Sequence, residues 1–322
     1  GADLGRGVRL GEAQVARNMG FSFEWNAVRL GKVQGTDDPT LIGETYVEFQ
    51  GLGGSSWASA QVGRFQIPVG ENYLRFSKGY RNNPFITNTV GGPWWWDEGI
   101  RVYGSDDDGR FGYVASISGG DTPIEEDSSR ELQFTGKLWT EPWPWLRASV
   151  SALRSGQTGS NNDMGSGALW LGETWATPVG ALAFRTPTWQ DGQIVPDAPN
   201  GIDSTTLLAG DLTFTSERFG RLWLAFGHYA IDAEGSGRYD RDLLYWIAEW
   251  MLEGRSVAPE LTPFYLALRG SGLGTYDDAE GYLLDVRDMG RLGYNAKLLE
   301  AYSIGLGWRL TRNDAGARID HG

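Results

Sequence analysis

The stretch Leu132–Trp139, LQFTGKLW, decides the fold class. Up to Leu138 its even-numbered positions are apolar or glycine, whereas Gln133, Thr135 and Lys137 between them are polar. An alternation of period two is the pattern of a β-strand with one apolar and one polar face, because successive side chains of a strand point to opposite sides. This stretch therefore predicts a strand.

The same alternation recurs along the chain and marks about thirteen strand segments. Leu243–Leu252 is apolar on both faces except for Glu249, and Val8–Arg17 barely alternates. The clearest other segments are Leu41–Gln50, Leu146–Leu153, Leu208–Thr215, Phe264–Arg269 and Tyr302–Leu310. Their apolar side carries residues that we expect to face membrane hydrocarbon: Phe49, Leu132, Phe134, Val150, Phe214, Leu266 and Ile304.

Turn-forming residues separate the strand segments. Asp106–Gly109 predicts a hairpin, because Asp and Gly favour tight turns between strands. Pro142–Pro144 cannot continue a strand and predicts another turn. Glu71–Gly99 and Gly156–Ser204 read as long, irregular functional loops. No linker or change of composition divides the chain, so residues 1–322 are expected to form one domain.

Composition excludes several classes of function. The chain has no Cys and two His, which argues against disulfides, thiolate chemistry and multi-histidine metal sites. A net charge of −13 argues against nucleic acid as a partner. The longest apolar run, Leu243–Ala248, is far shorter than the roughly twenty residues of a membrane-spanning helix. No catalytic motif is found, so we expect neither an enzyme, nor a metal site, nor a cofactor.

Two all-β architectures remain: a large soluble sandwich or propeller, and a transmembrane antiparallel β-barrel. The barrel is favoured because segments of about ten residues suit membrane-spanning strands. It also accounts for charges on the polar faces, which a water-filled lumen accepts, and for tryptophans at strand ends, which suit an interfacial girdle. Sixteen strands are expected, within a range of 14–18. The expected lumen-lining residues are Glu44, Glu48, Arg64, Lys137, Arg147, Glu249, Arg269 and Arg309, and the expected girdle residues are Trp57, Trp139, Trp143, Trp145, Trp250 and Trp308.

A basic cluster in an acidic protein marks a candidate pore constriction. Arg75, Lys78 and Arg81 stand within the long segment that begins at Glu71. If this loop folds into the lumen, its basic groups face acidic lumen residues such as Glu48. A transverse field of that kind orients polar solutes and favours neither sign of ion strongly.

The stretch Val62–Glu71, VGRFQIPVGE, resembles a strand end in the phosphate-selective (polyphosphate-selective) porin family, with the pattern Val-Gly-x-Phe-x-x-Pro-Phe-Gly. Arg81–Phe85, Trp96–Ile100 and Ser303–Leu310 also resemble segments of that family. The resemblance implies a trimeric outer-membrane barrel that passes small solutes by diffusion. The family's anion selectivity depends on lumen arginines and clustered lysines. This chain has four scattered lysines and an acidic balance, so phosphate specificity is not carried over.

These observations together predict a passive diffusion channel for small hydrophilic solutes or ions in the bacterial outer membrane. It is expected to be weakly selective with a slight preference for cations. The expected partners are outer-membrane lipid, lipopolysaccharide and further copies in a homotrimer. The alternative is a non-conducting outer-membrane barrel that scaffolds or anchors a partner protein in an envelope complex.

Overall fold

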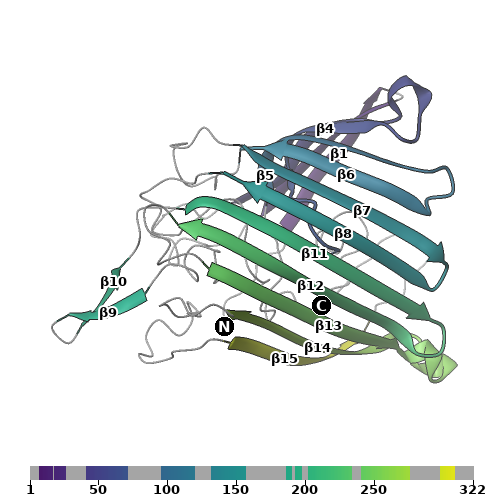
Figure 1. The fold of residues 1–322 in the computed structure, drawn as a ribbon. Helices are drawn as coiled ribbons and strands as arrows, with labels where there is room; N and C mark the ends of the chain where they lie inside the picture. Colours follow the sequence, from purple (N-terminus) through teal and green to yellow (C-terminus); the bar gives the residue numbers. More distant parts are fainter. Residues whose placement is uncertain are drawn as a thin grey trace.

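The protein forms one large antiparallel sheet (Figure 1). The structure, a computed structural model, describes residues 7–16, 18–26, 41–71, 96–119, 132–156, 186–190, 193–197, 202–233, 241–275 and 298–308. The strands of the first half are β1 (Gly7–Ala16), β2 (Met19–Asn26), β3 (Leu41–Phe49), β4 (Ser59–Gln66), β5 (Trp96–Ser105), β6 (Phe111–Ser118), β7 (Gln133–Trp143) and β8 (Leu146–Ser155). Those of the second half are β9 (Thr186–Gln190), β10 (Gln193–Asp197), β11 (Ile202–Ser216), β12 (Gly220–Ala233), β13 (Arg241–Glu253), β14 (Phe264–Thr275) and β15 (Leu298–Trp308).

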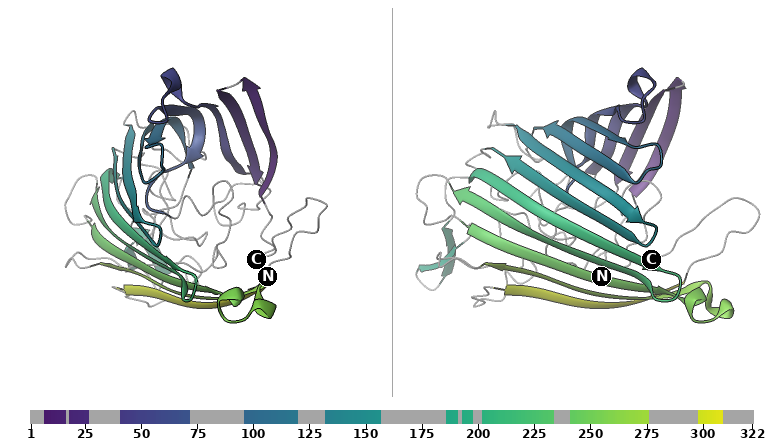
Figure 2. Two further views of the ribbon diagram at one scale, coloured as in Figure 1. Left: turned by 90° about the vertical axis from the view of Figure 1, so that its right-hand side faces the viewer. Right: turned by 45° about the vertical axis from the view of Figure 1, so that its right-hand side comes forward.

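The main sheet has 13 strands in the order β1 to β8 followed by β11 to β15, so its strands pair in the order of the chain, and β8 pairs with β11. The strands β9 and β10 form a separate two-stranded hairpin. Figure 2 shows that the main sheet curls around an interior, which gives it a concave inner and a convex outer face. Within the described residues no pairing joins β1 to β15, so closure of the sheet and the expected count of sixteen strands remain proposals.

Short turns join neighbouring strands at one end of the sheet, on the right in Figure 1. The predicted hairpin at Asp106–Gly109 is confirmed. The Asp106 carboxylate accepts hydrogen bonds from the backbone N–H groups of Arg110 and Phe111, and Gly109 takes up the left-handed conformation with φ 66°. At the same end, η1 (Leu52–Gly54), η3 (Gly254–Ser256) and η4 (Pro259–Leu261) are short helical turns. Among the described residues no helix is long and apolar enough to cross a membrane.

The predicted alternation of faces is confirmed on β7. Gln133, Thr135 and Lys137 are buried on the concave face, whereas Phe134 and Leu138 are about half exposed on the convex face. On the other strands, too, exposed apolar side chains lie on the outside. These include Val62, Ile100, Ile117, Val150, Leu208, Phe226, Ile304 and Leu306. The sheet thus buries many polar and charged groups on its inner face and exposes large apolar groups on its outer face, the reverse of the usual pattern in a soluble protein.

Two long segments differ in part from the irregular loops expected from sequence. Trp96–Gly99 already belongs to β5, and the hairpin of β9 and β10 lies within the segment from Gly156 to Ser204. The strand β11 begins at Ile202, before the end of that segment. Mixed polar and small residues hide the alternation at these strand starts, which explains why sequence alone did not find them.

Candidate functional site

Three hydrogen-bonded clusters of polar side chains lie on the concave face of the sheet. The first joins β3, β4 and β5 around Glu48. Gln61 Nε2 and Tyr103 OH each donate a hydrogen bond to Glu48 Oε1 at 2.6 Å. The Arg101 guanidinium in turn donates through Nε to Gln61 Oε1 at 2.7 Å and through Nη1 to the Gln66 carbonyl at 3.1 Å. In this cluster the side-chain amide of Gln61 links the Glu48 carboxylate to the Arg101 guanidinium.

The second cluster fixes the segment that follows β4. The residues from Ile67 to Glu71 are all buried, and they reach the inner face of β7 and β8, three and four strands away from β4 in the sheet. Gly70 N–H donates to Ser151 Oγ at 3.0 Å, and Lys137 Nζ donates to the Gly70 carbonyl at 2.6 Å. The chain therefore crosses the interior of the curled sheet at this point.

Glu71 is the anchor of that crossing. Its Oε1 atom lies 2.6 Å from Lys137 Nζ, and its Oε2 atom lies 3.1 Å from Arg147 Nε. Burial alone would raise the pKa of Glu71, which lies outside the strands. The charges of Lys137 and Arg147 and the hydrogen bonds that they donate outweigh burial and hold that pKa below its ordinary value. The carboxylate is thus held in its charged form, and we call this arrangement the Glu71 anchor.

Gly70 and Asp211 extend the Glu71 anchor onto β11 and β12. Gly70 has φ 67°, and a Cβ atom there would lie 3.5 Å from Asp211 Oδ2, so the backbone turns directly over this carboxylate. Asp211 accepts a hydrogen bond from Trp223 Nε1 at 3.0 Å and another from Ser149 Oγ at 3.4 Å. The left-handed conformation favours glycine, because other residues are strained in it.

The third cluster lies on β12, β13 and β14. Glu249 and Arg269 stand directly opposite each other in the strand register, with Arg269 Nη1 3.7 Å from Glu249 Oε2. Arg221 Nη2 lies 3.5 Å from the other carboxylate oxygen, and the Arg269 guanidinium lies over the Trp223 ring at 5.4 Å from its centroid. Charges of both signs again meet on the inner wall.

The structure places most of the expected lumen residues on the concave face. Glu48, Lys137, Arg147, Glu249 and Arg269 all lie there, in the three clusters described above. The side chains of Glu44 and Arg309 lie outside the described residues, as do Arg75, Lys78 and Arg81 of the expected constriction.

Arg64 and Trp139 lie apart from these lumen residues and from the girdle, respectively. Arg64 stands opposite Glu98 in the register, with its Nη1 atom 3.4 Å from Glu98 Oε1, and it is buried, whereas Val62 two positions earlier is exposed. It belongs to none of the three clusters. Trp139 stands on the inner side, where the Arg147 guanidinium lies 4.3 Å from its ring centroid, so it does not belong to the girdle. For Trp139 the position along the strand decides the face, because side chains of a strand alternate between its two sides.

Other expected girdle residues lie near the short-turn end. Trp143 and Trp145 stack at 5.2 Å between ring centroids, and Trp57 lies 6.1 Å from Phe111; all four of these rings are exposed. Trp250 donates from Nε1 to the Phe219 carbonyl at 2.7 Å. The side chain of Trp308 lies outside the described residues.

Sequence reasoning did not single out Gln61, Arg101, Glu71, Asp211 and Trp223. Asp211 stands on the polar side of an alternating segment, which was an available signal. The role of Glu71 could not be predicted from the sequence, because it depends on contacts with strands that are far away in the sequence. The strand histidine, His228, lies 2.9 Å through Nε2 from Asp242 Oδ1 and alternates with the buried inner residues, so it stands apart from the three clusters.

Comparisons with known proteins bear on the fold. No family model matches the chain, and no curated protein matches it by sequence. Among solved structures, OmpF from Salmonella typhi in complex with daunomycin matches with a TM-score of 0.50 and 11% identity, over 94% of this chain and 77% of that chain. The similarity at this identity concerns the fold, and it shows that the chain has a porin-like all-β fold.

Two further outer-membrane proteins match less closely. An anion-selective porin from Comamonas acidovorans has a TM-score of 0.46 and 10% identity, over 92% of this chain and 86% of that chain. OprB from Pseudomonas putida has a TM-score of 0.34 and 9% identity, over 89% and 83% of the two chains.

Proposed function

We propose that the chain closes into a barrel of about sixteen strands in the bacterial outer membrane and conducts small hydrophilic solutes or ions by passive diffusion. The observation that carries this proposal is the reversed sheet: apolar side chains are exposed on the convex face, and ionised side chains are paired on the concave face. Exposed apolar strands are unfavourable in water and favourable in lipid, because only lipid leaves the apolar surface free of water. The porin-like fold supports the same conclusion.

The ends of the strands support a membrane orientation. Short turns face the periplasm and long loops face the exterior in barrels of bacterial outer membranes. The exposed tryptophans Trp57, Trp143 and Trp145 lie near the short turns, at the level where an interfacial girdle meets lipid headgroups. On this proposal lipopolysaccharide surrounds the long-loop end.

The inner wall supports weak selectivity. Among the described residues its cations are matched by a similar number of carboxylates, so the wall offers no ladder of unopposed basic groups. The cations are Arg101, Lys137, Arg147, Arg221 and Arg269, and the carboxylates are Glu48, Glu71, Asp97, Glu141, Asp211 and Glu249. We therefore propose a pore with a slight cation preference rather than a phosphate-selective one.

The constriction and the assembly are further parts of the proposal. The Glu71 anchor leads the chain into the interior directly before Arg75, Lys78 and Arg81, which supports a constriction built from these three residues. A homotrimer is proposed from the porin-like fold and from the exposed apolar strip on β15, formed by Tyr302, Ile304 and Leu306. Native mass measurement in mild detergent that finds only a 35.4 kDa species would remove the trimer.

A liposome-swelling assay tests the proposed function. Liposomes that contain the refolded protein should swell in isosmotic arabinose and more slowly in isosmotic raffinose, because a water-filled pore discriminates by size. Protein-free liposomes are the control. A folded, membrane-inserted protein that admits neither sugar would contradict the proposal and favour the non-conducting scaffold.

A further inference from the structure

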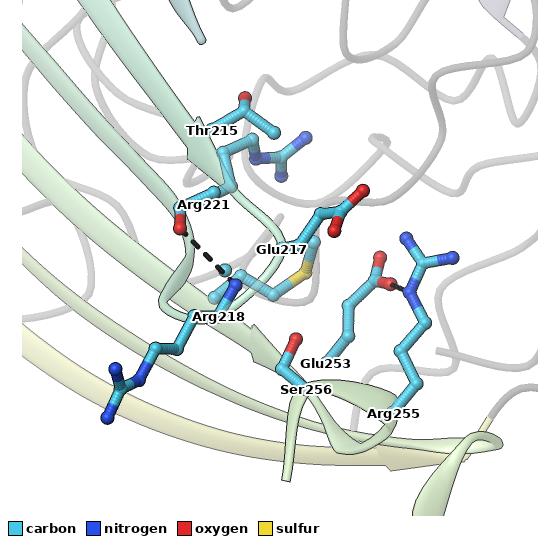
Figure 3. Close-up of a pocket in the computed structure, with 10 residues that line it drawn as sticks. Thr215, Glu217, Arg218, Arg221, Glu253, Arg255 and Ser256 are labelled. Carbon is cyan, nitrogen blue, oxygen red and sulfur yellow. Dashed lines mark hydrogen bonds and ion pairs between the residues drawn. The ribbon is translucent and has the colours of Figure 1, made fainter. Parts of the chain in front are cut away.

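A cavity of about 700 Å³ lies at the short-turn end of the sheet, apart from the Glu71 anchor. Its lining comes from the turn between β11 and β12 and from the end of β13 with η3 (Figure 3). Thr215 and Ser256 contribute hydroxyl groups, and Met251 contributes an apolar surface. We call this cavity the vestibule; no role has been assigned to it above.

Charged groups of both signs point into the vestibule. Figure 3 shows the charged ends of Glu217, Arg221, Glu253 and Arg255 converging on one space. Arg218, by contrast, points away from it, and its guanidinium lies 5.3 Å from the Phe219 ring centroid. The vestibule is therefore lined by charged groups of both signs rather than of one sign.

Glu217 and Arg255 are the two groups best placed to take up a ligand. Among the described residues no ion pair engages the exposed Glu217 carboxylate. The Arg255 side chain is 69% exposed, and its Nε atom pairs with Glu253 Oε2 at 2.6 Å. This ion pair is made through Nε and does not use the two Nη groups. A guanidinium can bind a carboxylate through two parallel hydrogen bonds, and a carboxylate binds an ammonium group well.

Other ligand classes fit this arrangement less well. A simple anion at Arg255 would meet the repulsion of Glu217 and Glu253. The described residues contain no group of three or more acidic or histidine side chains arranged to hold a metal ion. A solute with one ammonium and one carboxylate group can satisfy both kinds of charge at once.

We propose that the vestibule binds zwitterionic solutes that carry an ammonium and a carboxylate group, such as amino acids and short peptides. The ammonium group binds the Glu217 carboxylate and the carboxylate group binds the Arg255 guanidinium. The proposal rests on the proposed channel function, because it names a class of solute that the channel holds at its short-turn mouth.

Binding of glycylglycine to the refolded full chain in detergent, followed by ligand-observed NMR, tests the vestibule. The comparison ligands are N-acetyl-glycylglycine, which lacks the ammonium group, and glycylglycinamide, which lacks the carboxylate. We expect each to bind about tenfold more weakly than glycylglycine, a difference that corresponds to about 1.4 kcal/mol. Equal binding of the three ligands, or no binding of glycylglycine, would overturn the proposal.

Variants locate the binding. Glu217→Gln and Arg255→Gln each change an exposed side chain outside the strands, so folding should be preserved. Each should weaken glycylglycine binding about tenfold. Arg218→Gln is the matched control and should bind as the parent does. If all three variants bind like the parent, the site lies elsewhere and the proposal fails.

KCl conductance of the same preparations separates this proposal from the channel function. A parent that conducts but does not bind glycylglycine contradicts the vestibule site alone. A parent that binds glycylglycine but does not conduct contradicts the channel and leaves the binding site standing.

Discussion

At the scale of single residues, Val150 shows how the outer face of the sheet differs from the inner face. Val150 on β8 is 60% exposed, whereas its neighbours Ser149 and Ser151 are buried on the inner face. It stands opposite Leu138 in the register, and along the chain it lies between Trp145, which we propose for the girdle, and the exposed Arg154. Val150 therefore lies near the middle of the proposed apolar belt.

A charge placed at Val150 tests whether this position faces lipid. Val150→Arg is expected to lower the free energy of unfolding by about 2–4 kcal/mol, the cost of Arg on the lipid face near the bilayer midplane. Urea unfolding from phospholipid bilayers measures it. Val257→Arg makes the same change in an exposed turn and should cost about 0–1 kcal/mol. Equal stability of Val150→Arg and the parent would place Val150 in water.

The Glu71 anchor is the second residue-scale feature that can be tested. Glu71→Gln removes a buried carboxylate that pairs with both Lys137 and Arg147, and it is expected to lower the free energy of unfolding by about 3 kcal/mol at pH 7. Glu141→Gln removes the more exposed partner of Arg147 and should cost less than about 1 kcal/mol. Similar losses for the two variants would contradict the anchor.

The pH dependence of the same measurement gives an independent check. Because the pKa of Glu71 is lowered in the folded protein, its stabilisation is fully present above its unfolded value of about 4.3 and is lost as the pH falls through the folded pKa. The parent should therefore lose stability below about pH 4, and Glu71→Gln should lose less. Identical pH profiles of the parent and Glu71→Gln would show that Glu71 does not contribute to the pH dependence of the free energy of unfolding.

At the scale of elements, alternation was enough to predict strands and their faces wherever the two faces differ, as on β7 and β8. It was not enough on β13, because Leu243, Tyr245 and Ile247 are buried inward while Leu244 is exposed outward, so both faces are apolar. The Glu71 anchor could not be predicted either. Its contacts join residues far apart in sequence, and no local pattern encodes them.

Close packing between strands gives an element-scale prediction on β14. A Cβ atom on Gly272 would lie 2.4 Å from Trp246 Nε1, because the Trp246 indole from β13 covers this glycine. Gly272→Val is therefore expected to cost about 1–3 kcal/mol of unfolding free energy through overpacking. On β7, Gly136 has open space around its Cβ position, so Gly136→Val should be neutral or stabilising. Equal effects of the two variants would show that Trp246 does not cover Gly272.

At the scale of the whole molecule, the selectivity of the proposed pore depends on where charge stands along it more than on the net charge of −13. Salt screens charges beyond about 10 Å at 0.1 M, so a constriction outweighs distant acidic loops. Neutralising Arg75, Lys78 and Arg81 together to Gln should raise the cation preference of the channel. The triple variant with Arg110, Arg154 and Arg218 changed to Gln alters the net charge equally at exposed sites and should leave selectivity unchanged. An unchanged reversal potential in the first variant would place the basic cluster outside the pore.

The reversed sheet with a balanced, ion-paired inner wall leads to one central claim, the proposal that the sheet closes into a barrel and acts as a weakly selective channel. Recording from the purified protein in a planar bilayer under a KCl gradient tests it most directly. The claim predicts discrete steps of conductance and a small reversal potential with the sign of a slight cation preference. The absence of steps from inserted protein, or a reversal potential close to the limit for an anion-selective pore, would contradict it.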